Sequence, residues 1–308
     1  MNFAPDAPAD RSPGAIRLIE PFGLGGGPDV VARTIAGPLS KRWGRPVEVE
    51  NRPGGGSTAA PALVAKALAD GATLLVSTSA HAYSAAVTRG LPYDPLGDFV
   101  AVTPLTAQAY VLVVGRAVGI SSLSELISAA KGRPGAMTFG STGEGTGTHI
   151  GTEELNLMAG IKAAHVPAGP GDSIAEVVAG VASGAIDYVM LPISMATTGI
   201  AAGTLTALGV TTAKRSPALP GVPAISEVGV AGYDFPIWYG VWAPADTPNM
   251  VVERLARDIT AAVSEPVVHD WLVNHGMSPL RMTPRDFTDF VRVEKLRAER
   301  IIQAVGLT

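Results

Sequence analysis

The sequence contains no cysteine, so disulfide bonds, thiolate nucleophiles and cysteine-ligated metal sites are excluded. Charged residues make up only 16% of the chain, and a net charge of −4 offers no basic surface for nucleic acid. No apolar run reaches the roughly 18 residues that cross a bilayer. The start, Met1 to Pro13, also lacks the basic end and apolar stretch of a signal peptide. Either a signal has been removed or the protein stays inside the cell.

Hydrophobic residues are plentiful at 47%, and 36 glycines and 25 prolines indicate many short elements joined by tight turns. A length of 308 residues exceeds that of one ordinary domain, so we expect two lobes. Strand patterns alternate with helix patterns, which predicts α/β lobes with mostly parallel sheets covered on both faces. We expect strands at 15–19, 47–50, 73–77, 111–114, 136–139, 185–190 and 205–210. We expect helices from Pro28 and at 58–69, 123–131, 149–159, 250–264 and 284–304.

Two glycine loops, 21–27 and 140–148, each follow a predicted strand and open a helix. The first turn of a helix has backbone N–H groups without intrahelical partners, and glycine lets an anion approach them closely. Loops in separate halves of the chain could grip one ligand from both sides of a cleft. We expect the backbone of Gly25, Gly26 and Thr146 to clamp a carboxylate. We also count Asp29, whose charge complements the dipole of the first helix, among the ligand-binding residues. The alternative is that both loops are ordinary strand–helix turns.

Hydroxyl side chains accompany these loops. Thr78 and Ser79 follow the third predicted strand, where open parallel sheets place their ligands. The second loop carries Ser141, Thr142, Thr146 and Thr148. These hydroxyls can donate to a carboxylate, or they only satisfy the backbone of turns.

Other motifs are weaker. Gly23, Gly25 and Gly27 precede Glu50 as in a dinucleotide fold, but Pro28 stands where a third glycine is needed. An NAD-dependent oxidoreductase therefore remains the rival hypothesis. His149 and Glu153 share a helix face without a third ligand, which favours a supporting role over a zinc site. The charged face at 292–300 is interpreted as solvated. We predict no catalytic residue, no metal site and no cofactor.

A resemblance emerges from motifs in order along the chain. They are PFGLGGGPDVVAR (21–33), VENRPGGG (49–56), LPYDP (91–95), DF (98–99), GTGTH (145–149), HVP (165–167), AKRSP (213–217), LPGVP (219–223) and WYGVWAP (238–244). This ordered set resembles the Bug family, the substrate-binding proteins of tripartite tricarboxylate transporters. The resemblance runs from about residue 15 to the C-terminus.

The resemblance implies a type II periplasmic binding-protein fold, with two lobes joined by two crossing strands and closed by a hinge. It implies lobe boundaries of 15–106 with 235–308, and 107–234. It also implies ligand contacts at Phe22 to Gly26, at Thr78, Ser79, Ala80 and His81, and at Ser141 to Thr148. The expected ligand is a small carboxylate, either a dicarboxylate or an aromatic acid. The expected partners are the membrane components of the transporter, with the chain acting as a periplasmic monomer.

One departure bears on the ligand. Family members often carry Tyr-Lys-Gly after His-Val-Pro, whereas Ala168 and the run 169–172 follow here. Loss of an aromatic and a cation would widen the pocket and weaken a distal anionic contact. We expect Phe22, Leu24, Pro192 and Trp238 to form apolar walls, with Ala168 beside them. A ligand sensor or scavenger that serves a signalling partner remains open, because it needs the same loaded state.

Overall fold

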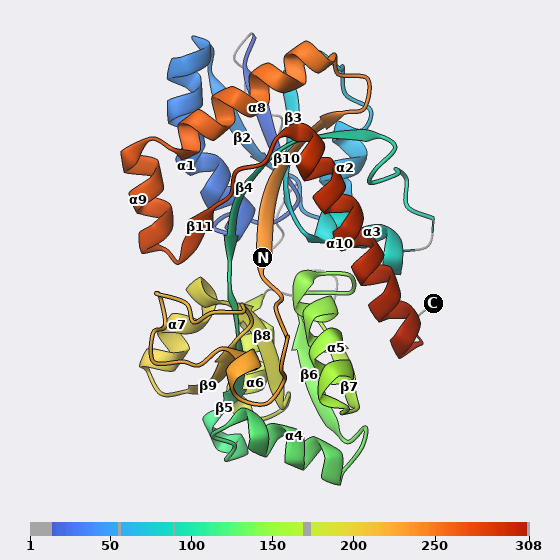
Figure 1. Ribbon diagram of the computed structural model, residues 1–308, viewed down its shortest axis with the longest axis vertical. Coiled ribbons are helices and arrows are strands. Elements are labelled where there is room, and N and C mark those ends of the chain that lie inside the picture. The colour runs from blue at the N-terminus through green and yellow to red at the C-terminus, as the bar shows by residue number, and fades with distance from the viewer. Residues whose placement is uncertain (1–13, 55–56, 89, 169–173, 307–308) are drawn as a thin grey trace, which may run out of the picture.

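The computed structural model describes residues 14–54, 57–88, 90–168 and 174–306. In these ranges the chain forms two α/β lobes, each built on its own sheet (Figure 1). The run 169–172, where the sequence departs from the family pattern, lies outside the described residues. None of the helices in the described part has the length and apolar character needed to span a bilayer.

Lobe 1 is built on the sheet with strand order β11-β4-β10-β3-β1-β2. Its strands are β1 (Ile16–Glu20), β2 (Val47–Asn51), β3 (Thr73–Thr78), β4 (Phe99–Gln108), β10 (Ile237–Pro244) and β11 (Met277–Pro279). Its helices are α1 (Gly27–Trp43), α2 (Ala59–Val64), α3 (Ala80–Val87), α8 (Asn249–Val263), α9 (Pro266–Asn274) and α10 (Pro284–Val305).

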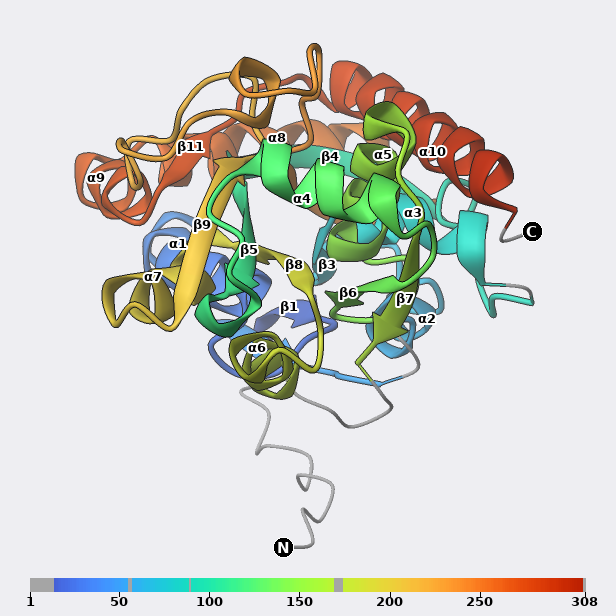
Figure 2. The ribbon, with the colours of Figure 1, turned by 90° about the horizontal axis from the view of Figure 1, so that it is seen from below.

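Lobe 2 is built on the sheet with strand order β7-β6-β8-β5-β9. Its strands are β5 (Tyr110–Gly115), β6 (Met137–Ser141), β7 (Ala163–Pro167), β8 (Tyr188–Pro192) and β9 (Leu205–Val210). Its helices are α4 (Leu123–Gly132), α5 (Gly147–Ala159), α6 (Ile174–Ser183) and α7 (Ile193–Ala201). Viewed from below, these helices surround the sheet on both sides (Figure 2).

The chain passes between the lobes twice, from β4 to β5 through Ala109 and from β9 back to β10. These crossings make the sheets mixed rather than mostly parallel, which corrects the expectation from sequence. Strands β1, β2 and β3 pair in parallel, but β10 runs antiparallel to both β3 and β4. In lobe 2, β5 runs antiparallel to β8 and β9. A strand that arrives from the other lobe enters the sheet from its far end, and therefore runs against its neighbours.

Strand β5 shows why apolar runs predicted the lobe 2 sheet well. Tyr110, Leu112 and Val114 face the main core, while Val111 and Val113 face a second cluster on the opposite side. Both faces of the strand are therefore buried, as its unbroken apolar sequence indicates.

Strand β4 was not predicted, because Pro104 interrupts its pattern. Pro104 lies opposite Gly240 at a register shift, where the missing N–H is tolerated.

The second helix is shorter than the predicted range 58–69. It ends at Val64, after which the backbone continues in tighter turns, with Lys66 N donating to Leu63 O and Ala67 N donating to Val64 O. The helix predicted from His149 begins two residues earlier, at Gly147. This places the end of the second glycine loop inside the first turn of α5.

Candidate functional site

A cavity of about 550 Å³ lies between the lobes. Lobe 1 contributes the loop between β1 and α1 and the end of β3, and lobe 2 contributes the loop that opens α5 and the start of α7. Tyr110, Ile237 and Tyr239 line it from the segments that connect the two lobes. Of the described residues that line it, none has a charged side chain. Any polar recognition of a ligand by these residues comes from amides and hydroxyls.

Side chains behind the first glycine loop fix its shape. Asp29 Oδ2 accepts the Gly25 N–H at 2.9 Å, and Asp29 Oδ1 accepts from Asn51 Nδ2 at 2.9 Å and from Arg33 Nε at 2.8 Å. Gly25 has a φ of +77°, a conformation that favours glycine. Asp29 therefore shapes the loop from outside the cavity, rather than facing a ligand as expected.

Glu20 lies beneath the same loop and is completely buried. Its Oε2 accepts the Phe22 N–H at 2.9 Å, and its Oε1 accepts from Asn51 Nδ2. Burial raises the pKa of Glu20 to about 8, against the lowering effect of these two hydrogen bonds. The loop thus rests on a carboxyl group whose protonation changes near neutral pH.

The second loop is held by a chain of hydroxyls. Thr148 Oγ1 accepts the Thr142 N–H at 2.9 Å and lies 3.0 Å from Thr142 Oγ1 and 2.9 Å from Thr146 Oγ1. Thr142, Thr146 and Thr148 line the cavity. Ser141 does not: its fully buried Oγ lies 2.6 Å from His165 Nε2 and bonds both backbone groups of Gly143. Ser141 therefore braces the loop, which corrects its expected place in the lining.

Two buried histidines complete this support. His149 Nδ1 accepts the Gly145 N–H at 3.2 Å, and its ring stacks on His165 with centroids 4.0 Å apart. Burial lowers the pKa of His149 to about 3 and that of His165 to about 4, so both rings are neutral at neutral pH. His149 has the supporting role that its sequence context favoured.

The amides expected to clamp a ligand are engaged inside their own loops. Gly25 N donates to Asp29 Oδ2, Gly26 N donates to Gly23 O at 3.1 Å, and Thr146 N donates to Gly143 O at 3.4 Å. These amides are therefore not free in this structure, because the tight turn before each helix uses the amide of the N-cap residue, Gly26 in α1 and Thr146 in α5.

Free amides lie one step further along each loop. Gly27 and Gly147 are the first residues of α1 and α5, both line the cavity, and among the described residues neither amide has an acceptor. The Thr148 amide in the second position of α5 is free in the same sense. The two helices therefore present unpaired N–H groups to one cavity from opposite lobes.

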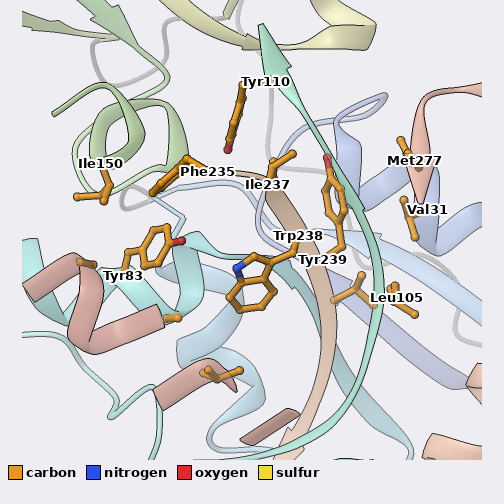
Figure 3. Close-up of a cluster of buried hydrophobic side chains, with 14 of the residues drawn as sticks. Val31, Tyr83, Leu105, Tyr110, Ile150, Phe235, Ile237, Trp238, Tyr239 and Met277 are labelled. Atoms are coloured by element: carbon orange, nitrogen blue, oxygen red, sulfur yellow. The ribbon is translucent and has the colours of Figure 1, made fainter. Parts of the chain in front are cut away.

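Two tyrosines that the sequence analysis missed lie against these helix starts. A Cβ on Gly27 would lie 2.4 Å from Tyr239 Oη, and a Cβ on Gly147 would lie 2.1 Å from Tyr110 Oη. Figure 3 shows both rings near the segments that join the lobes. The Tyr239 hydroxyl accepts from Gln108 Nε2, and the Tyr110 hydroxyl makes no hydrogen bond within the described ranges. Burial raises the pKa of both, so they stay protonated donors.

The end of β3 contributes less than expected. Thr78 and Ala80 line the cavity, and Thr78 Oγ1 accepts the Ala80 N–H at 3.1 Å. Ser79 is buried with an unpartnered Oγ, 3.4 Å from where a Cβ on Gly147 would lie. The contact expected at His81 is wrong, because its ring packs inside lobe 1 between Phe99 and Trp242, 4.7 and 4.8 Å from their centroids.

The apolar walls match the expectation for Phe22, Leu24, Ala168 and Pro192, which line the cavity. The expectation for Trp238 is wrong. Successive side chains of a strand point to opposite faces, so Tyr239 faces the cavity while Trp238 faces α10 (Figure 3). There its Nε1 donates to Glu294 Oε2 at 3.0 Å. Met195 and Ile237 complete the apolar lining, and no sequence pattern had marked them.

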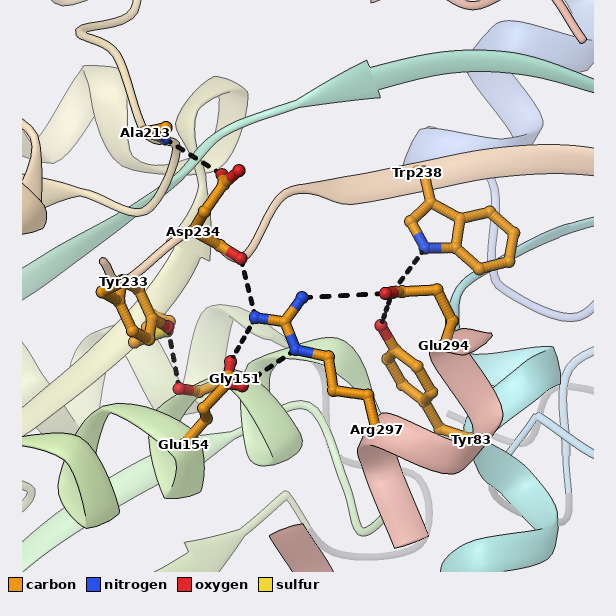
Figure 4. A network of polar contacts seen from close by, with 10 residues as sticks. Tyr83, Gly151, Glu154, Ala213, Tyr233, Asp234, Trp238, Glu294 and Arg297 are labelled. Carbon is orange, nitrogen blue, oxygen red and sulfur yellow. Dashed lines mark hydrogen bonds and ion pairs between the residues drawn. The ribbon is translucent and has the colours of Figure 1, made fainter. Parts of the chain in front are cut away.

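A polar network joins the two lobes beside the cleft (Figure 4). Arg297 of α10 donates to both carboxylate oxygens of Glu154 in α5, at 2.8 and 2.6 Å, and to Asp234 O at 2.7 Å. Glu294, which is buried, accepts from Tyr83 and Trp238. The interpretation of 292–300 as a solvated face is therefore wrong for Glu294 and Arg297, although Arg292 and Arg300 are exposed.

The dinucleotide hypothesis requires Glu50 to accept a hydrogen bond from the ribose of NAD, and this carboxylate is already bonded. Glu50 Oε2 accepts from Arg17 Nε at 3.0 Å, and Glu50 Oε1 accepts from Arg52 Nε. The carboxylate is thus engaged by two guanidinium groups, and it does not line the cavity.

Known proteins resemble this chain over nearly its whole length. A family model described as the tripartite tricarboxylate transporter family receptor matches residues 31–307. The UPF0065 protein in the tcbD-tcbE intergenic region of Pseudomonas sp. (strain P51) is 34% identical, covering 93% of this chain and 85% of that protein. Protein BugT of Bordetella pertussis is 31% identical, covering 99% and 94%. The structure of R. palustris Rpa4515 with adipate is 32% identical, with a TM-score of 0.86 over 96% of this chain and 98% of that one.

Proposed function

The chain belongs to the tripartite tricarboxylate transporter receptor family, and we propose that it captures a small carboxylate in the cavity between its lobes. The ordered motifs had led to the same family. The observation that carries the proposal is the convergence of two helix N-termini and two buried tyrosine hydroxyls on a cavity without charged lining residues in the described ranges. A structural relative holds adipate, a carboxylate.

The magnitudes are sufficient for a useful affinity. A hydrogen bond to a charged group contributes roughly 1.5–3 kcal/mol. The free amides of Gly27, Gly147 and Thr148, with the hydroxyls of Tyr110 and Tyr239, provide enough donors for the roughly four hydrogen bonds that a carboxylate accepts. Four such bonds contribute about 6–12 kcal/mol, a range that includes the ~8 kcal/mol of a micromolar complex. The loss of translational and rotational freedom on binding subtracts from this sum. The positive ends of α1 and α5 add to the attraction for an anion.

Membership of a receptor family supports transport rather than catalysis. The family consists of periplasmic binding proteins, and we propose that this chain acts in the periplasm, as a monomer and without catalysing a reaction. We propose that it delivers its ligand to the membrane components of a tripartite transporter. The lobes, at 15–106 with 235–308 and at 107–234, close by rotation about the two crossings. A sensor would use the same closed state, and a delivery assay with the membrane components separates the two roles.

Calorimetry with the purified chain tests the proposal. A panel of small mono- and dicarboxylates should contain at least one ligand with a dissociation constant near the micromolar range, and the matching uncharged amide should bind far more weakly. NAD should not bind. Failure of every carboxylate to bind, or equal binding of the amide, would overturn the proposal.

A further inference from the structure

Glu20 is a buried acid beneath the first glycine loop, and it shares one amide group with a second acid. The Glu20 side chain accepts from the Phe22 N–H and from Asn51 Nδ2. The two hydrogens of Asn51 Nδ2 have further acceptors, because the same nitrogen lies 2.9 Å from Asp29 Oδ1 and 3.4 Å from Phe22 O. Two acidic side chains therefore compete for one amide group in a site where Glu20 has no exposed surface.

Of the two acids, only Asp29 has a cation as a partner in the described ranges. Arg33 of α1 forms an ion pair with Asp29 and donates its other end to Asn51. The remaining basic residues of α1 lie in its last turn. A buried carboxylate without a cation is costly, and a like charge beside it adds to the cost. A proton that relieves this pair of acids is therefore held by Glu20.

The other elements packed on β1 do not compensate Glu20. Strand β3 and helix α2 contain no titratable residue. Successive residues of a strand point to opposite faces of the sheet, so Asn51 of β2 shares the face of Glu20 while Glu50 points away. The charged side chains on that opposite face bond one another there, or lie along it; they are Arg17, Glu48, Glu50 and Arg52.

The loop above these two acids is part of the ligand cavity. Glu20 Oε2 accepts the Phe22 N–H, and Phe22 lines the cavity. Asp29 Oδ2 accepts the Gly25 N–H, and Gly25 lines the cavity as well. The amide of Gly27, which has no acceptor among the described residues, ends the same loop. A carboxylate bound there would bring a third negative charge toward the two acids, through protein of low dielectric constant.

Resting on the proposed carboxylate function, we propose that Glu20 is a positioning residue that couples capture of the ligand to uptake of a proton. With the proton on Glu20, the loop faces the ligand with one negative charge behind it, that of Asp29. Without the proton, two negative charges lie behind the loop and the ligand is held more weakly. The cleft therefore binds its carboxylate more tightly at acidic and neutral pH than at alkaline pH.

The pH range of the effect follows from burial. Burial raises the pKa of Glu20 to about 8, and the charge of a bound anion raises this pKa further. Well below the first value Glu20 is protonated with and without ligand, so affinity does not depend on it. Between the two values binding takes up a proton. An increase of about 0.5–1 in the pKa on binding predicts an affinity that falls about three- to eightfold between about pH 6.5 and 9.5.

Calorimetry in buffers of different ionisation enthalpy measures this proton directly. With the best-binding carboxylate at about pH 8.5, roughly a quarter to a half of a proton should be taken up per ligand. At about pH 6 the measured enthalpy should no longer depend on the buffer through Glu20. Binding without proton uptake, at an affinity that stays constant across this range, overturns the proposal and leaves the carboxylate function intact. If no carboxylate binds at any pH, the proposed function fails as well.

Two matched variants assign the proton. Glu20→Gln removes the titrating group and keeps an oxygen for the Phe22 N–H, so it should bind without this uptake and without the alkaline loss of affinity. Glu48→Gln makes the same chemical change on the opposite face of the sheet and should keep the wild-type pH profile. Proton uptake that persists in Glu20→Gln, or that disappears in Glu48→Gln, refutes the assignment to Glu20. The wild-type measurement needs no variant, so it decides the proposal even if Glu20→Gln does not fold.

Discussion

Replacing Gly147 by alanine tests the contact between the start of α5 and Tyr110. An ideal Cβ at Gly147 lies 2.1 Å from Tyr110 Oη and 3.1 Å from Tyr110 Cζ. The first distance is far shorter than a normal van der Waals contact. Tyr110 is 2% exposed and belongs to β5, so its ring has little freedom to move. Overpacking of this kind costs about 1–3 kcal/mol, and alanine returns about 0.4–1 kcal/mol by restricting the unfolded chain. We expect a net loss of about 1–2 kcal/mol in the free energy of unfolding.

Combining Gly147→Ala with Tyr110→Phe separates stability from binding. Without Oη the nearest ring atom is Cζ at 3.1 Å, so alanine should cost less than about 1 kcal/mol in this background. The double variant should therefore recover stability. It should not recover affinity, because the Tyr110 hydroxyl is a proposed donor to the carboxylate. Losing that hydrogen bond should weaken binding about tenfold or more.

Urea unfolding and calorimetry with the best carboxylate measure the two effects. Gly132→Ala at the end of α4 is the control, because its Cβ meets nothing within 4 Å and the next residue is not proline. It should stabilise the chain by up to about 1 kcal/mol and leave binding unchanged. If alanine at Gly147 costs the same free energy with and without the Tyr110 hydroxyl, the contact described here does not exist.

Three further predictions address other parts of the molecule. Gly27→Ala should weaken carboxylate binding about tenfold by calorimetry, because its Cβ would lie 2.4 Å from Tyr239 Oη and displace that donor. Arg297→Met should lower the urea-unfolding free energy by about 2 kcal/mol, less than for a fully buried pair because Arg297 is 25% exposed; adding Glu154→Gln should restore part of it. The stability advantage of wild type over Glu20→Gln should fall as pH rises from about 5 to 8.5, because the folded state holds the Glu20 proton up to a pKa of about 8. The lowered pKa values of His81, His149 and His165 make the protein less stable in acid. Both variants contain these histidines, so their effect cancels when one stability is subtracted from the other.

The glycine loops and their helices were predictable because their causes are local. Proline at a helix start, glycine in a tight turn and an acidic side chain in the first turn act within a few residues, as at Gly25, Pro28 and Asp29. The ordered motifs likewise identified the family, since they are properties of the sequence itself. Strand β5 was predictable because burial on both faces requires an unbroken apolar run.

The choice of cavity-facing side chains was decided by tertiary structure. The free amides depend instead on short turns: Gly26 N bonds Gly23 O within the first loop, and a run of glycines does not indicate which amide such a turn uses. A shift of β10 by one residue along its neighbours would turn Trp238 toward the cavity and Tyr239 away from it. The register that prevents this comes from the pairing of β10 with β3 and β4. Glu294 is buried and Arg297 is partly buried because α10 packs against α5 of the other lobe. Local sequence sets what each segment can form, but the faces that meet depend on contacts between residues far apart in the chain, which no local pattern encodes.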